Sequence, residues 1–204
     1  QRVGAYLLVD IAHPAGLIAA GLLENPVPYA DVVTTTTHKT WRGPRGCGVI
    51  LCKQTLAEKI DKAVSPGIQG SPKMDMIAAR AVLAKECMSK EFRAYQQCVL
   101  ENAQALADAL QQCGFRLVTG GTDTHLILVD VRSHIASGRE ADAVLSSVGI
   151  VVNKEPLPFD PQPHDVTSGI RIGTPALTTR GFKAEQFRQV ACWMSDALYN
   201  AHDP

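Results

Sequence analysis

The sequence predicts a mixed α/β protein in three parts: residues 1–72 as part of an α/β domain, a connecting helix over 73–113, and a compact α+β domain over 114–204. A continuous apolar run at 5–11 predicts a strand that is buried on both faces, as in a parallel sheet covered by helices. Apolar residues at steps of three and four predict the connecting helix. Strand-like and helical segments then alternate, which predicts the second domain.

The first part contains three predicted strands. The strand at 5–11 leads through a turn into a short helix at 16–23, and further strands are expected at 31–37 and 49–52. The second strand ends in a run of threonines, whose β-branched side chains favour extended structure, so Lys39 should lie at or just past its end. A strand that is buried on both faces normally lies in the middle of a larger sheet, and three strands are few for such a sheet. We therefore expect the chain to be a fragment, or a preceding segment to be missing.

The middle and last parts are built from helices and strands. The helical repeat runs from Lys73 to about Gln112, and a break is expected near Ser89 because about 40 residues is long for one globular helix. Gly114 is a typical residue at the end of a helix. After it, the sequence predicts helices at 139–148 and 183–200 and strands at 115–118, 126–131, 150–153 and 170–173.

Composition and charge argue against several classes of function. The chain has 20 Lys+Arg and 20 Asp+Glu, and zero net charge argues against nucleic acid or an anionic membrane as its main partner. No apolar stretch approaches the ~18 residues that span a bilayer. The six cysteines, Cys47 among them, lie far apart without a CxxC pair, which indicates reduced thiols in a cytoplasmic protein. No metal site is expected, because the isolated histidines lack metal-ligand spacing: His125, His134, His164 and His202.

Lys39 is the first candidate for chemistry. It follows His38 and the threonine run, and Arg45 lies a few residues further on. Neighbouring cationic groups and desolvation both lower the pKa of a lysine amine, which can then act as a nucleophile. Such a lysine suits a Schiff base with a carbonyl cofactor. Taken alone, a lysine after a polar strand end is more often simply solvated.

Asp10 is the second candidate. It ends an apolar strand, where open α/β sheets place ligand sites, and a buried carboxylate needs a partner. This carboxylate either keeps the ring nitrogen of a pyridoxal phosphate cofactor protonated or caps a turn. His13, three residues further on, either contacts the same ligand or caps that turn.

Two further features suggest anion binding. Arg171 lies between Ile170 and Ile172 on a strand-like segment. Its planar guanidinium either binds the carboxylate of an amino-acid substrate through two bonds or forms a structural ion pair. Gly67 and Gly70, flanked by prolines, form either a backbone cradle for an anion or an ordinary connection.

Five segments carry a pattern of their own: Asp10–Leu17, Val33–Thr40, Gly43–Gly46, Gly120–His125 and Ser168–Ala176. In this order, and over nearly the whole chain, they resemble the serine hydroxymethyltransferase family. The four threonines followed by His38 and Lys39 are highly specific. The resemblance implies the fold-type I group of pyridoxal phosphate enzymes, with the C-terminal part of its large domain followed by its small α+β C-terminal domain.

The resemblance also implies a cofactor site. Lys39 would bind pyridoxal 5'-phosphate through a Schiff base, and Asp10 would pair with the pyridine nitrogen. Ala12 would pack on the cofactor ring, and His13 would lie near the hydroxyl of that ring. Gly70 would approach the phosphate of the neighbouring subunit's cofactor, which implies a homodimer or a homotetramer.

The same resemblance implies the catalytic residues. Thr36 and His38 would line the cofactor and the substrate, beside Lys39. Arg45 falls where the family has an active-site arginine. Arg171 matches the arginine that binds the substrate carboxylate.

The implied reaction, in one-carbon metabolism, interconverts serine and glycine, with tetrahydrofolate as the co-substrate that carries the one-carbon unit. Ser65 and Glu155 stand where the family usually has a Phe and an Asn that are associated with folate contact, and the family's N-terminal half is absent. Two alternatives therefore stay open. One is a folate-independent pyridoxal phosphate aldolase or transaldolase of β-hydroxy amino acids. The other is a non-catalytic structural fragment, inactive alone.

Overall fold

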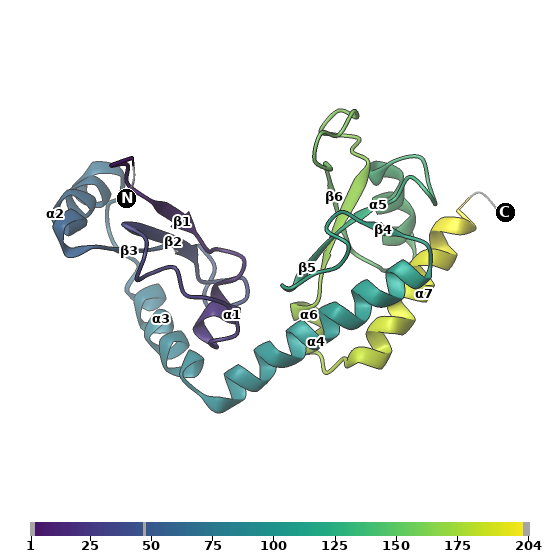
Figure 1. Ribbon diagram of the computed structural model, residues 1–204. Helices are drawn as coiled ribbons and strands as arrows, with labels where there is room; N and C mark the ends of the chain where they lie inside the picture. The colour runs from purple at the N-terminus through teal and green to yellow at the C-terminus, as the bar shows by residue number, and fades with distance from the viewer. Residues whose placement is uncertain (1–2, 47, 202–204) are drawn as a thin grey trace. The chain divides into compact units, whose positions relative to one another are not determined.

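The computed structural model describes residues 3–46 and 48–201, so Cys47 and His202 lie outside the described residues. The chain divides into two compact units, with the boundary between Gln96 and Gln97. Both units combine strands with helices, which confirms the predicted α/β class (Figure 1). Over the described ranges, no helix is both long enough and apolar enough to cross a bilayer.

In chain order the elements are β1 (Leu8–Asp10), α1 (Ala15–Ala19), β2 (Val32–Thr36), β3 (Gly48–Cys52), α2 (Gln54–Lys62), an irregular π-helical segment (Ala63–Ile68), α3 (Met74–Cys87), α4 (Lys90–Gln112), β4 (Arg116–Leu117), β5 (Leu126–Asp130), α5 (Gly138–Ser147), β6 (Asn153–Glu155), β7 (Gly169–Gly173), α6 (Pro175–Thr179) and α7 (Ala184–Tyr199).

The first unit is built on a sheet in the order β1-β2-β3. β1 runs parallel to β2 in a register that places Asp10 opposite Thr34, whereas β3 pairs with β2 in the antiparallel direction. The sheet is therefore mixed, not purely parallel as expected. Two helices also differ from the prediction: α1 is shorter than the helix expected at 16–23, and α2 follows β3 where the sequence pattern predicts no helix.

One face of β1 is open to solvent. Val9 packs on a small buried cluster, whereas Leu8 on the opposite face is 61% exposed. Side chains alternate along a strand, so Asp10 shares the open face with Leu8 and is itself exposed. The prediction of a strand buried on both faces is wrong, because within the described residues β1 is an edge strand covered on one side. The cluster beneath it consists of Ile11, Ala15, Ala30 and Val33.

Thr40 joins the segment after β1 to the segment after β2. Its Oγ1 donates to the His13 carbonyl oxygen at 2.6 Å and accepts from the Gly16 N–H at 2.8 Å. Gln96 Nε2 in turn donates to the Thr40 carbonyl oxygen at 2.7 Å. A Cβ on Gly16 would lie 2.3 Å from that carbonyl oxygen. The close approach of the two segments therefore requires glycine at this position.

The long helical segment breaks where the sequence predicts. α3 ends at Cys87 and α4 begins at Lys90, which confirms the break near Ser89. The Ser89 Oγ accepts from the Phe92 N–H at 3.0 Å. Such a contact satisfies a backbone donor that would otherwise lack a partner in the first turn of a helix, so Ser89 starts the second helix.

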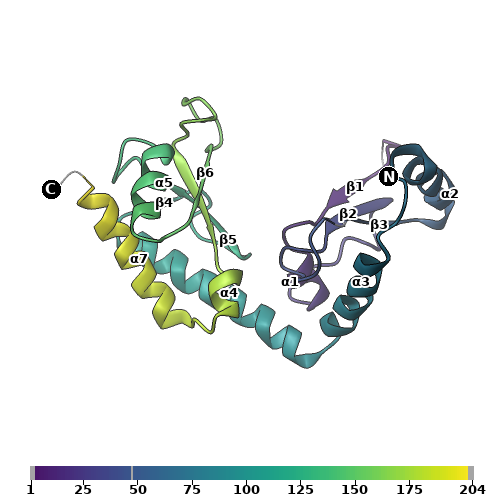
Figure 2. The same cartoon turned by 180° about the vertical axis from the view of Figure 1, so that it is seen from behind.

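The second unit contains a sheet in the order β4-β5-β7-β6, in which every neighbouring pair is antiparallel. β5 and β6 therefore run in the same direction, joined through α5, with β7 inserted between them; this is a split βαβ arrangement. Buried residues of α4, α5 and α7 pack with the sheet in the main core (Figure 2). The core includes Leu110, Leu145, Ile170 and Phe187.

β6 lies further along the chain than the sequence predicts. The expected strand at 150–153 is wrong, because pairing with β7 begins at Asn153, opposite Arg171. The Ile150 N–H instead donates to the Leu145 carbonyl oxygen at 2.8 Å, which completes the end of α5. Ile150 and Val152 therefore belong to a connection that packs on the core, whereas Val151 between them is exposed.

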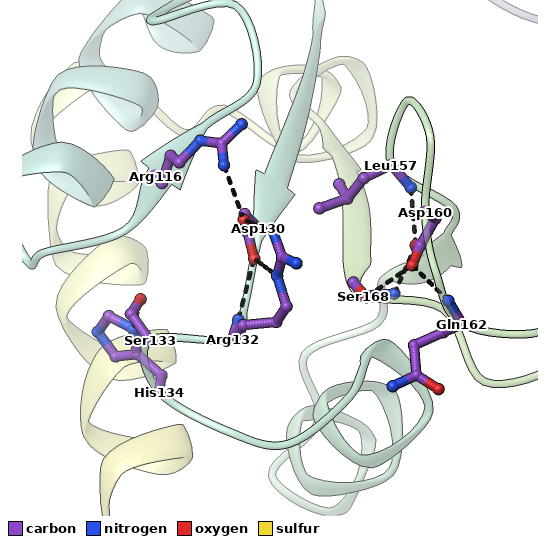
Figure 3. Close-up of polar contacts among 9 residues, drawn as sticks. All are labelled: Arg116, Asp130, Arg132, Ser133, His134, Leu157, Asp160, Gln162 and Ser168. Atoms are coloured by element: carbon purple, nitrogen blue, oxygen red, sulfur yellow. Dashed lines mark hydrogen bonds and ion pairs between the residues drawn. The ribbon is translucent and has the colours of Figure 1, made fainter.

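Asp160 anchors the proline-rich loop between β6 and β7 (Figure 3). Its carboxylate accepts from the N–H groups of Leu157 at 2.9 Å, Gln162 at 3.0 Å and Ser168 at 2.8 Å, and from the Ser168 hydroxyl at 2.7 Å. Burial raises the pKa of Asp160, but these hydrogen bonds outweigh it and hold the pKa well below the usual carboxyl range. The ionised Asp160 therefore holds the loop beside β7.

Gly16→Ala should destabilise the first unit by roughly 1–3 kcal/mol, because the added methyl group overpacks against Thr40. Gly48→Ala is the matched control, since a Cβ there would meet only the Thr35 carbonyl oxygen, at 3.9 Å. Urea unfolding followed by circular dichroism compares the free energies of unfolding. Equal free energies of unfolding of the two variants would show that the segments around Gly16 and Thr40 accommodate the added methyl group without loss of stability.

Candidate active site

The carboxylate of Asp10 is held in place at the end of β1. The Thr34 hydroxyl donates to Asp10 Oδ2 at 2.7 Å, and the Ala12 N–H donates to Oδ1 at 3.1 Å. The hydrogen bond from Thr34, followed by that from Ala12, lowers the pKa of Asp10 against a smaller opposing effect of burial. Electrostatic interactions with Lys39 and with His13 lower this pKa further. Asp10 is therefore an ionised, oriented carboxylate, although it is exposed and not buried as the sequence suggests.

Lys39 lies three residues past the end of β2, in a closed turn. The Arg42 N–H donates to the Lys39 carbonyl oxygen at 2.9 Å, and the Gly43 N–H donates to the Thr37 carbonyl oxygen at 2.7 Å. The Thr37 hydroxyl donates to the Pro44 carbonyl oxygen at 2.6 Å. Because β1 and β2 are parallel, Asp10 and this turn lie at the same edge of the sheet. The charge of Lys39 is close enough to act on the Asp10 carboxylate.

Two polar atoms beside Lys39 are buried without a hydrogen-bond partner in the part of the chain that the structure describes. They are Thr36 Oγ1 and His38 Nδ1, which precede Lys39; Trp41 Nε1, two residues after it, is also buried without such a partner. Leaving such an atom unsatisfied costs about 1–3 kcal/mol, so buried atoms of this kind commonly face a bound molecule or water. Thr36 and His38 therefore mark a polar surface next to Lys39 that suits a polar ligand.

The other predicted residues of the first unit differ in their surroundings. Ala12 is buried directly after β1. Arg45 and Gly70 are exposed. The neighbouring Arg42 instead stacks its guanidinium 4.4 Å from the centre of the Tyr95 ring. The sequence pattern gave no sign of this contact, nor of the Thr34 hydroxyl as the partner of Asp10.

Arg171 belongs to the second unit, on β7. Its neighbours Ile170 and Ile172 are buried in the core, so strand alternation turns Arg171 to the other face of the sheet. There it lines a cavity of about 870 Å³ together with residues of the 119–128 and 155–158 segments. Glu155, on the adjacent strand β6, forms an ion pair with Arg171, with 3.8 Å between Oε2 and Nη1.

Comparison with known protein families agrees with the pattern of residues. The family model described as serine hydroxymethyltransferase matches residues 1–194 of the chain. The match covers nearly all of both units and contains Asp10, Lys39 and Arg171.

Thr34→Val should raise the pKa of Asp10 toward the ordinary aspartate value of about 3.9, because the variant cannot donate to Oδ2. Thr34→Ser keeps the hydroxyl and should keep the pKa low. An NMR titration of the Asp10 carboxyl carbon compares the three proteins. An identical pKa in all of them would mean that the hydrogen bond does not determine the charge of Asp10.

Proposed function

Because this chain belongs to the serine hydroxymethyltransferase family of pyridoxal phosphate-dependent transferases, we propose that the protein interconverts serine and glycine, with tetrahydrofolate as the one-carbon carrier. The observation that best supports the proposal is that an ionised Asp10 and the turn that carries Lys39 lie at one edge of the sheet. An anionic group and a primary amine at the same edge of the sheet suit the two ends of one heteroaromatic cofactor.

The residues at this edge fit pyridoxal phosphate. Asp10 offers a carboxylate fixed by two hydrogen bonds, and Lys39 offers a primary amine that can react with an aldehyde. The unpartnered Thr36 Oγ1 and His38 Nδ1 offer polar atoms to a bound molecule. When bound, the cofactor supplies an electron sink for a carbanion at the substrate's α-carbon.

Each of the chain's own residues then has a defined task. The lowered pKa of Asp10 keeps its carboxylate anionic, so it can hold a proton on a ring nitrogen opposite it. Lys39 Nζ provides the covalent attachment, and Ala12 offers a small apolar surface to the ring. In the second unit, the guanidinium of Arg171 holds the carboxylate of the amino acid through its planar fork.

Further proposals concern the organisation of the protein. We propose a homodimer or homotetramer in which Gly70 approaches the phosphate of a neighbouring subunit's cofactor. In support, Gly70 is exposed, and within the described residues a Cβ there would meet no atom within 4 Å, so its backbone is accessible. We keep the domain limits 1–72, 73–113 and 114–204 and a cytoplasmic location as proposals.

A second candidate is a folate-independent aldolase or transaldolase that acts on β-hydroxy amino acids. Glu155 supports it, because a carboxylate stands there in place of the Asn that the family usually has for folate contact, and this carboxylate lines the cavity beside Arg171. Ser65 supports it too, since it offers no aromatic ring where the family usually has Phe. Both candidates use Asp10, Lys39 and Arg171 in the same way and differ in the fate of the fragment that is split from the amino acid: tetrahydrofolate accepts it in the first, and it leaves as an aldehyde or passes to another amino acid in the second.

Borohydride reduction of the chain in the presence of pyridoxal phosphate tests the role of Lys39. Peptide mass spectrometry should find the reduced label on Lys39 in preference to Lys62, an exposed lysine at the end of α2. Lys39→Arg should remove this label and any visible absorbance of the bound cofactor. Equal labelling of Lys39 and Lys62 would contradict the proposal and favour a structural role for the chain.

Serine cleavage by the protein, measured with and without tetrahydrofolate, separates the two candidate reactions. A requirement for tetrahydrofolate supports the hydroxymethyltransferase. A measurable rate that is the same in both conditions supports the folate-independent reaction, and no cleavage in either condition supports the non-catalytic fragment.

A further inference from the structure

Arg171 has a carboxylate beside it in the cavity of the second unit. Glu155 Oε2 lies 3.8 Å from Arg171 Nη1, and the two side chains are 36% and 33% exposed. This distance exceeds the 2.7–3.2 Å of an N–H···O hydrogen bond. The pair is therefore a loose electrostatic contact, not the bidentate contact that a guanidinium forms with a well-placed carboxylate.

The pairing of β6 with β7 fixes this arrangement. Asn153 is opposite Arg171, and Glu155 is opposite Gly169. Glu155 and Arg171 are thus diagonal neighbours on one face of the sheet, within reach of two long side chains. Gly169 leaves no side chain between them, and a Cβ at that position would lie 2.4 Å from Leu157 Cδ2. The sheet therefore holds Glu155 next to the guanidinium.

The charges around the cavity do not favour an anionic ligand as a whole. Arg171 is a cation, whereas Asp123 and Glu155, which also line the cavity, are acidic. A ligand carboxylate is attracted by Arg171 and repelled by the two acidic groups. Glu155 is the acidic group in contact with Arg171, so it acts most directly on any carboxylate that binds there.

We propose that Glu155 is a specificity-determining residue that competes with the ligand carboxylate for Arg171 and so weakens amino-acid binding. This inference rests on the proposed function of Arg171 as the carboxylate-binding residue. A ligand carboxylate must then either displace Glu155 from the guanidinium or bind beside it despite the repulsion between the two negative charges.

The test is a titration of the isotope-labelled full chain with sodium acetate and, separately, with glycine, followed through the backbone amide signals of β7. Glu155→Gln keeps the size of the side chain but removes its charge. It should tighten the binding of both ligands by up to about fivefold, the range expected for one partly exposed charge pair. Acetamide, which has no charge, should bind the two proteins alike.

Two variants serve as controls. Glu185→Gln makes the same charge change in the same unit, but Glu185 pairs with Arg188 on α7, so this variant should bind acetate as the unchanged chain does. Arg171→Gln should abolish binding, and Glu155→Gln added to it should have no effect.

Three results would overturn the inference. Weaker or unchanged binding in Glu155→Gln would mean that Glu155 positions Arg171 or has no role. An equal gain in Glu185→Gln would indicate a general charge effect, and absence of acetate and glycine binding in every variant would remove the competition itself. The titration needs no cofactor, so its failure is distinct from a failure of the Lys39 labelling.

Discussion

The parallel pairing of β1 with β2 is the constraint on which the candidate site depends. It places Asp10 opposite Thr34, and the Thr34 hydroxyl then orients the carboxylate and lowers its pKa. The same pairing brings the two segments that leave the strands to one edge, where Thr40 joins them. A turn closed by backbone hydrogen bonds then holds Lys39 at this edge, and the charge of Lys39 contributes to the lowered pKa of Asp10. The arrangement of the candidate site in the first unit therefore depends on the register of two short strands.

In the second unit, the packing of the sheet positions the charged side chains. Inserting β7 between β5 and β6 gives a sheet with one face on the helices and another that carries Arg171. The isoleucines on both sides of Arg171 are buried in the core, so the backbone of β7 that carries the arginine is held in place by packing. Glu155 comes from the neighbouring strand, and the loop that follows it is anchored by Asp160. Packing on one face thereby fixes charges on the other.

Sequence patterns predicted the elements whose signals are local. The threonine run and the Ile-Arg-Ile alternation fall on β2 and β7, and the break near Ser89 has a capping hydroxyl. Predictions failed where contacts with segments distant in the sequence determine the structure. β6 begins where β7 pairs with it and not where the apolar run begins, and the exposure of Asp10 depends on which elements cover β1. The Glu155–Arg171 contact likewise arises from strand register, which no spacing in the sequence reveals.

The most direct measurement concerns the ring nitrogen that Asp10 is proposed to face. Pyridoxal phosphate labelled with ¹⁵N in the ring and bound to the protein should show the chemical shift of a protonated nitrogen. Asp10→Asn should move that shift to the value of an unprotonated ring nitrogen, because the anionic partner is gone. The same shift in both proteins would contradict the claim that Asp10 and Lys39 act on one cofactor.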